Sequence, residues 1–370
     1  MRFAIGGASD VKIIAPTTVL PEISGRLIIN GYSQPGSSPN TQSSGDNAIL
    51  KIELDGSNIP SASGLTVMAG RSVIRGLVVN DFGVGIALLS GDENKVLGNF
   101  IGTDAAGTGG EGNATNLRLS ESSSNQIGAN LPAARNLISD ASNTGIALSG
   151  LTAAPASSNK IQGNYIGTDR SGNGDLGNGS SGADNGIRLG GASANNLIGG
   201  VGSEANVIAF TSGYGVNVRD AETTGNAVLG NSIHGNSLMG INIDAEGVGA
   251  NDPDDPDVGG NLRQNHPVIT DAEEVLPGDI NIDGTLDSIP NTTFKVQFFS
   301  NPIDEAVDEG KLFLGETSVT TNSGGDASFS TTLPVPGLEG QYVTGTATDP
   351  AGNTSEFSPA RVVEQVPIGP

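Results

Sequence analysis

The sequence predicts an all-β protein in which a parallel β-helix is followed by a small β-sandwich. One phrase rich in Asn and Gly returns along the chain, as NKVLGNFIGTD at 94–104, NKIQGNYIGTD at 159–169 and, in a divergent form, NAVLGNSIHGN at 226–236. A second phrase of the form G-I-x-L alternates with it, for example at 144–150. No segment shows a convincing helical stripe. Internal repetition is typical of stacked arrays and outweighs local propensity as a fold signal.

Each repeat contains three short pieces with alternating apolar positions, bounded by Gly or Asn, and this pattern indicates strands. Three strands that restart in the same order describe one rung of a parallel β-helix, with rungs about 4.8 Å apart. In such a solenoid each rung contacts only its neighbours, and the inward side chains form one continuous core. We therefore expect one inward column at Ile86, Leu117, Ile146, Ile187, Val216 and Ile241.

Asparagines recur at one turn position of the aligned rungs. Side-chain amides stacked at strand spacing can hydrogen-bond along the column, and Asn also tolerates the left-handed backbone that sharp corners need. We expect a structural ladder formed by Asn99, Asn136, Asn164, Asn206 and Asn231.

Composition changes divide the chain into four parts. Residues 1–63 are expected to form an irregular N-terminal cap and the first strands, and residues 64–250 the regular rungs. The acidic linker 251–270 opens with NDPDDPDVGG, which interrupts every strand pattern. Alternating strands separated by turn clusters then predict the sandwich at 271–370.

Charge excludes two classes of partner. The formal net charge is −23, and residues 251–370 hold 20 acidic residues against 4 basic ones. We expect neither nucleic acid nor an anionic membrane surface to bind such a chain. No apolar run is long enough for a membrane span, and residues 1–10 show no apolar signal-peptide region, as if the chain opened within a domain. The absence of Cys means that no disulfide staples the fold.

Several phrases together resemble a known family. These are SQPGSSPN at 33–40, the paired NxIxGNxIGTDxxG blocks, the acidic NDPDDPD and the run TATDPAGNTSEFS at 346–358. They are similar to the right-handed parallel β-helix repeat proteins of bacterial secreted multidomain proteins, which often carry an immunoglobulin-like sandwich after the β-helix. The resemblance implies a right-handed helix, an immunoglobulin-like second domain and a secreted or cell-surface location. Right-handed β-helices also include pectate lyases and other polysaccharide enzymes, an analogy at the level of fold only.

Two functions remain open. The leading hypothesis is a non-catalytic extracellular or cell-surface protein with a structural, adhesive or glycan-binding role, whose partner is a polysaccharide or another surface protein. The alternative is a polysaccharide lyase or glycoside hydrolase that uses the outward face between Phe100 and Tyr165.

Apolar residues follow the ladder asparagines on a face that should meet solvent. A contiguous apolar patch on a soluble protein usually marks an interaction site. We therefore expect Phe100 and Tyr165 to be at least partly covered by an excursion of the chain, a partner or a glycan. The stripe comprises Phe100, Leu137, Tyr165, Val207 and Ser232.

Charged residues also occupy outward columns. Alignment places Asp81, Asp104 and Asp169 at one column position, and Asp140 one residue away from it. Carboxylates on alternate rungs would lie roughly 10 Å apart, slightly beyond the ~6.5–9.5 Å of inverting glycosidases. Asp is also the expected turn residue in T-D-x-x-G.

Two arginines share another outward column, in the G-I-x-L strand. Arg118 and Arg188 could bind acidic sugars, or could be solvated surface residues.

The linker carries the strongest metal signal. Its four aspartates, Asp252, Asp254, Asp255 and Asp257, lie within six residues. Oxygen donors at this density suit Ca²⁺, although the Gly and distal Glu of an EF-hand are missing. A solvated acidic hinge is an equal alternative. His234 and His266 are far apart in the sequence, so a transition-metal site is not expected.

Overall fold

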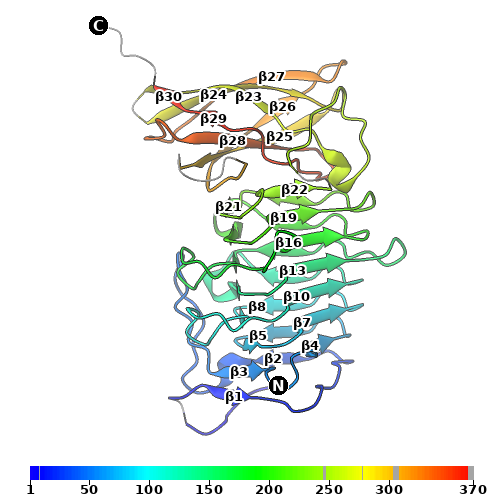
Figure 1. The fold of residues 1–370 in the computed structure, drawn as a ribbon, viewed down its shortest axis with the longest axis vertical. Helices are drawn as coiled ribbons and strands as arrows, with labels where there is room; N and C mark the ends of the chain where they lie inside the picture. The colour runs from blue at the N-terminus through cyan, green and yellow to red at the C-terminus, as the bar shows by residue number, and fades with distance from the viewer. Residues whose placement is uncertain (8, 245–246, 277, 303–307, 366–370) are drawn as a thin grey trace.

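The computed structural model describes residues 1–7, 9–244, 247–276, 278–302 and 308–365. Short strands stack in rungs along one axis, and a pair of antiparallel sheets covers the C-terminal end of the stack (Figure 1). Three parallel sheets form the sides of the stack. Along the chain, β5 lies in sheet 1, β6 in sheet 2 and β7 in sheet 3, so these three strands make one turn of the coil.

The strands of the three sheets are two to six residues long. Sheet 1 contains β2 (Ile28–Asn30), β5 (Val73–Arg75), β8 (Lys95–Leu97), β11 (Gln126–Gly128), β14 (Lys160–Gln162), β17 (Leu197–Gly199) and β20 (Ala227–Leu229). Sheet 2 contains β1 (Lys12–Ile14), β3 (Ile52–Asp55), β6 (Val78–Asn80), β9 (Phe100–Ile101), β12 (Leu137–Ile138), β15 (Tyr165–Ile166), β18 (Val207–Ala209) and β21 (Ser232–His234). Sheet 3 contains β4 (Ser63–Val67), β7 (Val84–Leu89), β10 (Thr115–Ser120), β13 (Thr144–Ser149), β16 (Asn185–Gly190), β19 (Tyr214–Val218) and β22 (Ile241–Ile243).

The expected inward column is confirmed by the strand register of sheet 3. Leu117 pairs with Ile146, Ile146 with Ile187, and Ile187 with Val216. All six side chains of the column are at most 1% exposed. They belong to one hydrophobic core that runs the length of the stack. This arrangement is what a solenoid needs, because no single rung can bury its apolar face alone.

The asparagine ladder is also confirmed. The Asn99 amide donates to Asn136 Oδ1 at 3.1 Å, Asn136 to Asn164 at 2.9 Å, and Asn164 to Asn206 at 3.0 Å. The left-handed backbone expected at these asparagines is not observed. All five ladder asparagines are described, and none has a positive φ. The preceding glycine adopts the left-handed backbone instead in three of the rungs, for example Gly98 at φ +63°.

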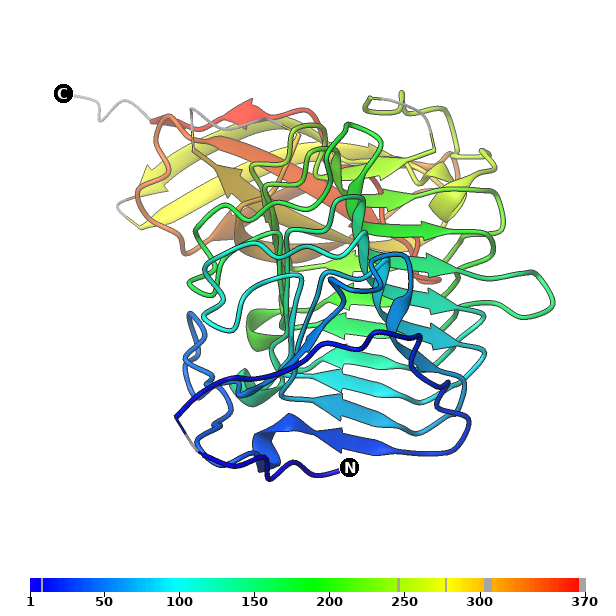
Figure 2. The ribbon, with the colours of Figure 1, turned by 60° about the horizontal axis from the view of Figure 1, so that its bottom comes forward.

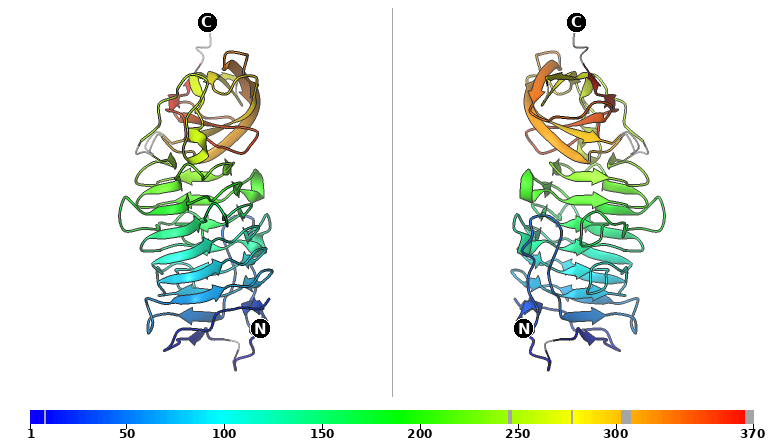
Figure 3. Two further views of the ribbon diagram at one scale, coloured as in Figure 1. Left: turned by 90° about the vertical axis from the view of Figure 1, so that its right-hand side faces the viewer. Right: turned by 90° about the vertical axis from the view of Figure 1, so that its left-hand side faces the viewer.

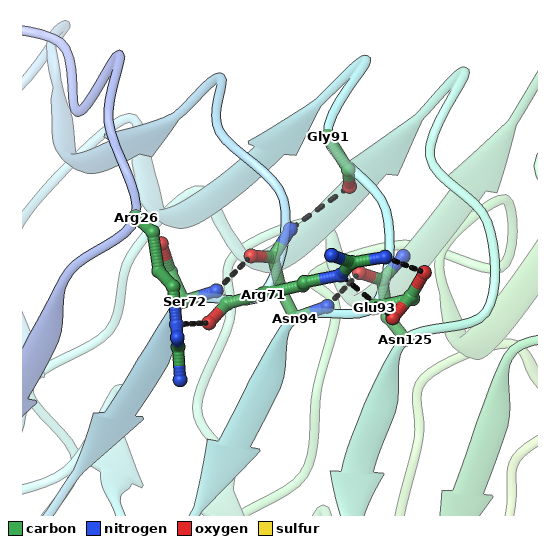
Figure 4. Close-up of polar contacts among 7 residues, drawn as sticks. All are labelled: Arg26, Arg71, Ser72, Gly91, Glu93, Asn94 and Asn125. Atoms are coloured by element: carbon green, nitrogen blue, oxygen red, sulfur yellow. Dashed lines mark hydrogen bonds and ion pairs between the residues drawn. The ribbon is translucent and has the colours of Figure 1, made fainter.

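A second ladder follows the corner between sheets 3 and 1 (Figure 4). Asn94 accepts a bond from the Ser72 N–H and donates to the Gly91 carbonyl, each at 2.8 Å, and its own N–H donates to Asn125 Oδ1. These amides satisfy backbone groups that a tight corner leaves unpaired. The column comprises Asn94, Asn125, Asn159, Asn196, Asn226 and Asn261.

The C-terminal part consists of two four-stranded sheets around a second core. One sheet has the order β27 (Asp326–Leu333), β24 (Asp279–Asp287), β23 (Val268–Leu276), β30 (Glu364–Gln365). The other has the order β26 (Leu312–Thr320), β25 (Thr293–Asn301), β28 (Tyr342–Thr348), β29 (Arg361–Val362). All pairs are antiparallel except β23 with β30. These sheets are only loosely immunoglobulin-like.

The sandwich closes the C-terminal end of the β-helix core. Phe299 and Phe357 pack edge to face, 5.3 Å apart, and belong to the helix core. Gly310 forms an isolated antiparallel bridge to Ile233 in the last rung of sheet 2. Glu356 accepts the Ile243 N–H at 2.8 Å. The two parts therefore share one interface.

The first 63 residues add strands to the parallel sheets but leave the N-terminal end of the core open. An apolar cavity of about 560 Å³ remains there, and Figure 2 brings this end of the molecule forward. Its lining includes Phe3, Leu20, Leu27 and Ile52. The sandwich thus closes the C-terminal end of the solenoid, whereas the N-terminal end keeps an open apolar cavity.

We expect the junction to weaken as pH rises. Burial raises the pKa of Glu356 to about 7, from an ordinary value of 4.5. A carboxyl with a raised folded-state pKa stabilises the folded state fully below the unfolded pKa, and this contribution is lost as pH rises through the folded value. For Glu356 this loss is on the order of 3 kcal/mol. Melting temperatures of the wild type and of Glu356→Gln should be measured between the two pKa values, 4.5 and about 7. The melting temperature of the wild type should depend more steeply on pH. Parallel profiles would contradict the raised pKa of Glu356.

Candidate functional site

The predicted apolar stripe lies on the outward face of sheet 2, and the chain itself covers it. Phe100 is fully buried and Tyr165 is 7% exposed. Residues 31–51, which connect β2 with β3, cross this face, and the blue segment lies beside the cyan and green rungs in both views of Figure 3. The Gly45 N–H donates to the Tyr165 hydroxyl at 2.8 Å. The expectation that both rings are covered is confirmed, and the cover is an excursion of the chain.

Two arginines fix this cover in place. The Arg135 guanidinium lies 4.3 Å from the centre of the Tyr165 ring, a cation–π contact. Arg170 donates to the carbonyls of Asp46 at 2.6 Å and Ala48 at 2.9 Å, and its guanidinium lies over Phe100. Residues 31–51 therefore lie directly on the two rings. A glycan-binding role of Phe100 and Tyr165 stays a prediction.

The aspartate columns differ from the alignment made from sequence. The register of β6, β9 and β12 places Asp81 and Asp140 at one position, each a residue earlier than Asp104. Asp104 and Asp169 begin equivalent excursions, and both act in turns: Asp104 accepts the Thr108 N–H, and Asp169 the N–H groups of Ser171 and Gly174. Burial alone would raise the pKa of Asp169, but bonds from Ser171 and nearby backbone N–H groups outweigh it and lower that pKa.

Arg118 and Arg188 lie on the outward face of sheet 3. The register confirms their column, with Arg118 beside Ala147 and Ala147 beside Arg188. Arg219 lies on the same face, two residues after Asn217 of that column. All three arginines are exposed, and none of their side chains makes a hydrogen bond or ion pair among the described residues. The pKa of Arg188 is lowered by partial desolvation of its guanidinium and by the positive charges of Arg219 and Arg118. We call these three residues the arginine face.

A groove that sequence reasoning missed runs along sheet 1. It has a volume of about 610 Å³. Lys95, Gln126 and Lys160 share one outward column on its floor. Glu204 and Glu93 also line it, and Glu93 is paired with Arg71 at 3.0 Å (Figure 4). These three residues each follow the first Asn of their repeat unit, and this shared position is the sequence signal that could have revealed the column.

A carboxylate cluster that sequence reasoning also missed lies at the corner between sheets 2 and 3. Asn80, at the end of β6, is fully buried and donates to Glu111 Oε2 at 2.7 Å and to Glu53 Oε1 at 3.4 Å. Burial and the charges of Asp55, Asp104 and Asp81 raise the pKa of Glu53. Burial and the same carboxylates, together with Glu53, raise the pKa of Glu111.

The four linker aspartates do not converge. Asp255 is buried and accepts bonds from the Ser288 hydroxyl at 2.5 Å and the Gln264 amide at 2.7 Å, whereas Asp254 and Asp257 are exposed. Burial raises the pKa of Asp255 to about 6. Across the described residues, no three His, Cys, Asp or Glu side chains are grouped closely enough to hold a metal ion. Calcium binding by Asp252, Asp254, Asp255 and Asp257 stays a prediction.

Comparison with known proteins gives a structural neighbour and no family. No family model matches the sequence, and no curated protein matches it significantly. A crystal structure of full-length tailspike protein 2 from Escherichia coli O157:H7 bacteriophage CAB120 is similar over 83% of this chain, with 12% sequence identity and a TM-score of 0.24. This chain spans about half of the tailspike chain, 49%. A likeness at this TM-score supports no argument about function. In the described part of the chain, no helix has the length and apolar character to cross a membrane.

Proposed function

We propose that this protein is a non-catalytic extracellular or cell-surface protein that binds an acidic polysaccharide on the arginine face. The proposal includes a right-handed β-helix and an immunoglobulin-like sandwich, as the family resemblance implies. The observation that carries it is the arginine face itself: three exposed arginines whose side chains make no hydrogen bond or ion pair among the described residues, in a chain of net charge −23.

The chemistry of the face suits carboxylate or sulfate groups. Arg presents a planar fork of N–H donors that matches such anions with two parallel bonds. Arg118 and Arg188 are two rungs apart, about 10 Å, with only the small Ala147 between them. An extended glycan that carries one acidic group on alternate sugars could lie along the helix axis and meet both. Burial and repulsion from the other two arginines lower the pKa of Arg188, and an anionic ligand would relieve the repulsion.

Removal of both arginine charges is expected to weaken binding strongly. Each lost charge-assisted contact costs about 1.5 kcal/mol or more, which is about tenfold in affinity. Arg118→Gln with Arg188→Gln should therefore bind polygalacturonate or hyaluronate about 100-fold more weakly in calorimetry. Neutral dextran serves as the uncharged ligand, and wild-type binding of the acidic chain should fall with added salt.

The matched control is Lys95→Gln with Lys160→Gln, which removes the same charge at the same two-rung spacing on sheet 1. It should retain wild-type affinity. Loss of binding in this variant alone would assign the glycan to the groove and overturn the arginine face. Lyase or hydrolase action remains the alternative function, and depolymerisation of a bound polysaccharide by the wild type would contradict the non-catalytic assignment.

A further inference from the structure

Arg219 is displaced sideways from the other two residues of the arginine face. Its backbone N–H donates to the Leu189 carbonyl at 3.0 Å, which continues the parallel ladder by one residue and places Arg219 beside Gly190. Arg118 and Arg188 follow the helix axis in one column. Arg219 lies one rung beyond Arg188 and two residues further along the strand, roughly 6.6 Å to the side of the column. A ligand that follows the column therefore reaches Arg219 only through a side group.

The carboxylate beside Arg219 in the next rung is already bonded. The strand register places Asp244 there. Its two oxygens accept the backbone N–H groups of Asp220 and Gly260, each at 2.9 Å. Its Oδ2 also pairs with Arg263 at 3.3 Å. Because Asp244 is bonded in this way, the Arg219 guanidinium has no ion pair among the described residues and can bind an external anion.

Two other carboxylates near the face are bonded to backbone groups. Asp184 and Asp220 lie near Arg188 and favour its charged form, but desolvation and the other two arginines outweigh them and lower its pKa. Asp184 accepts the Ser181 N–H and Asp220 the Gly191 N–H, each at 2.8 Å. In the described part of the chain, neither forms an ion pair with a guanidinium of the face. The positive charges are therefore left for a ligand.

Small residues separate the three arginines. Ala147 lies between the two arginines of the column. The neighbouring column, which ends at Arg219, continues through Gly190, Ser149 and Ser120. The hydroxyls of Ser120 and Ser149 lie 3.2 Å apart and bond to each other. No bulky side chain occupies these positions, so a sugar ring can lie close to the sheet with its substituents directed toward the arginines.

We propose that Arg219 binds a sulfate ester, so that the arginine face prefers sulfated to unsulfated acidic glycans. This inference rests on the proposed binding of an acidic polysaccharide to the same face. Acidic groups on alternate sugars meet Arg118 and Arg188, which are two rungs apart, and each sugar then spans about one rung. The sugar that follows the one at Arg188 lies over the rung of Arg219. A sulfate that projects sideways from that sugar meets the third guanidinium, whose fork can donate two parallel bonds to it.

Net charge does not explain such a preference. The chain carries a formal charge of −23, so its long-range field repels a polyanion. A sulfated glycan is more negative than its unsulfated form and is repelled more strongly. Tighter binding of the sulfated form must therefore come from a local contact, and Arg219 is the residue placed to make it.

Calorimetric titration with chondroitin and with chondroitin sulfate, of equal length and at one salt concentration, tests the inference. The two glycans share one backbone and differ in the sulfate ester. The wild type should bind the sulfated form about tenfold more tightly, which is the effect of one charge-assisted contact. Arg219→Gln should lose this preference and keep the wild-type affinity for unsulfated chondroitin.

Lys160→Gln is the matched control. It removes one positive charge at an exposed position of sheet 1, and it should keep the preference for the sulfated glycan. Arg219 is also exposed, so Arg219→Gln should melt at the wild-type temperature. A change in affinity would then report the lost contact and not a loss of folding.

Three outcomes would overturn the inference and leave the proposed function standing. The first is equal affinity of the wild type for the two glycans. The second is a preference that persists in Arg219→Gln. The third is an Arg219→Gln variant that binds both glycans more weakly by the same factor. A wild type that binds neither glycan would instead contradict the proposed function, and the inference with it.

Discussion

Ile146→Asp is expected to lower the free energy of unfolding by several kcal/mol. The side chain is fully buried, with Leu117 and Ile187 in the rungs on either side. An ionised carboxylate there would have no partner, and an uncompensated buried charge is among the most costly changes in a protein. Because each rung is stabilised by its neighbours, β10 and β16 should loosen together with β13.

Thermal melting and amide hydrogen exchange measure this effect. Ser149→Asp is the control, since it introduces the same charge at an exposed position of the same strand, and it should change stability by no more than about 0.5 kcal/mol. A variant Ile146→Asp that melts like the wild type would contradict the rung register.

Phe357→Ala is expected to cost about 3–5 kcal/mol, the usual range for removal of a buried aromatic ring. Phe357 comes from the sandwich but is 1% exposed within the β-helix core, where it packs against Phe299. Its loss would leave a cavity at the junction and open the end of the core. We therefore expect the last rungs and the sandwich to lose stability together.

Hydrogen exchange localises this result. The amides of Ile233 and Ile243, which bond to Gly310 and Glu356 across the junction, should exchange faster in Phe357→Ala. Leu312→Ala, at an exposed position of the sandwich, should leave them unchanged. Unchanged exchange in Phe357→Ala would show that the sandwich does not stabilise the helix end.

The sequence predicted part of the candidate sites and missed the rest. Arg118 and Arg188 were found because outward columns follow from a period of two, and the register keeps them in one column. Arg219 was missed because it lies beyond that column. The partnership of Asn80 with Glu53 and Glu111 joins residues 27 and 31 positions apart through an excursion whose path no local pattern specifies.

The sequence by itself determined the parallel rungs, the inward column and the asparagine ladder, because each is a periodic feature that repeats in every unit. Only the tertiary structure decided what covers Phe100 and Tyr165, how the sandwich closes the core through Phe357, and that Asp255 is buried. These features depend on single, non-repeated contacts between distant segments. A strand's period fixes which way its side chains point, but not which excursion or domain will pack against them.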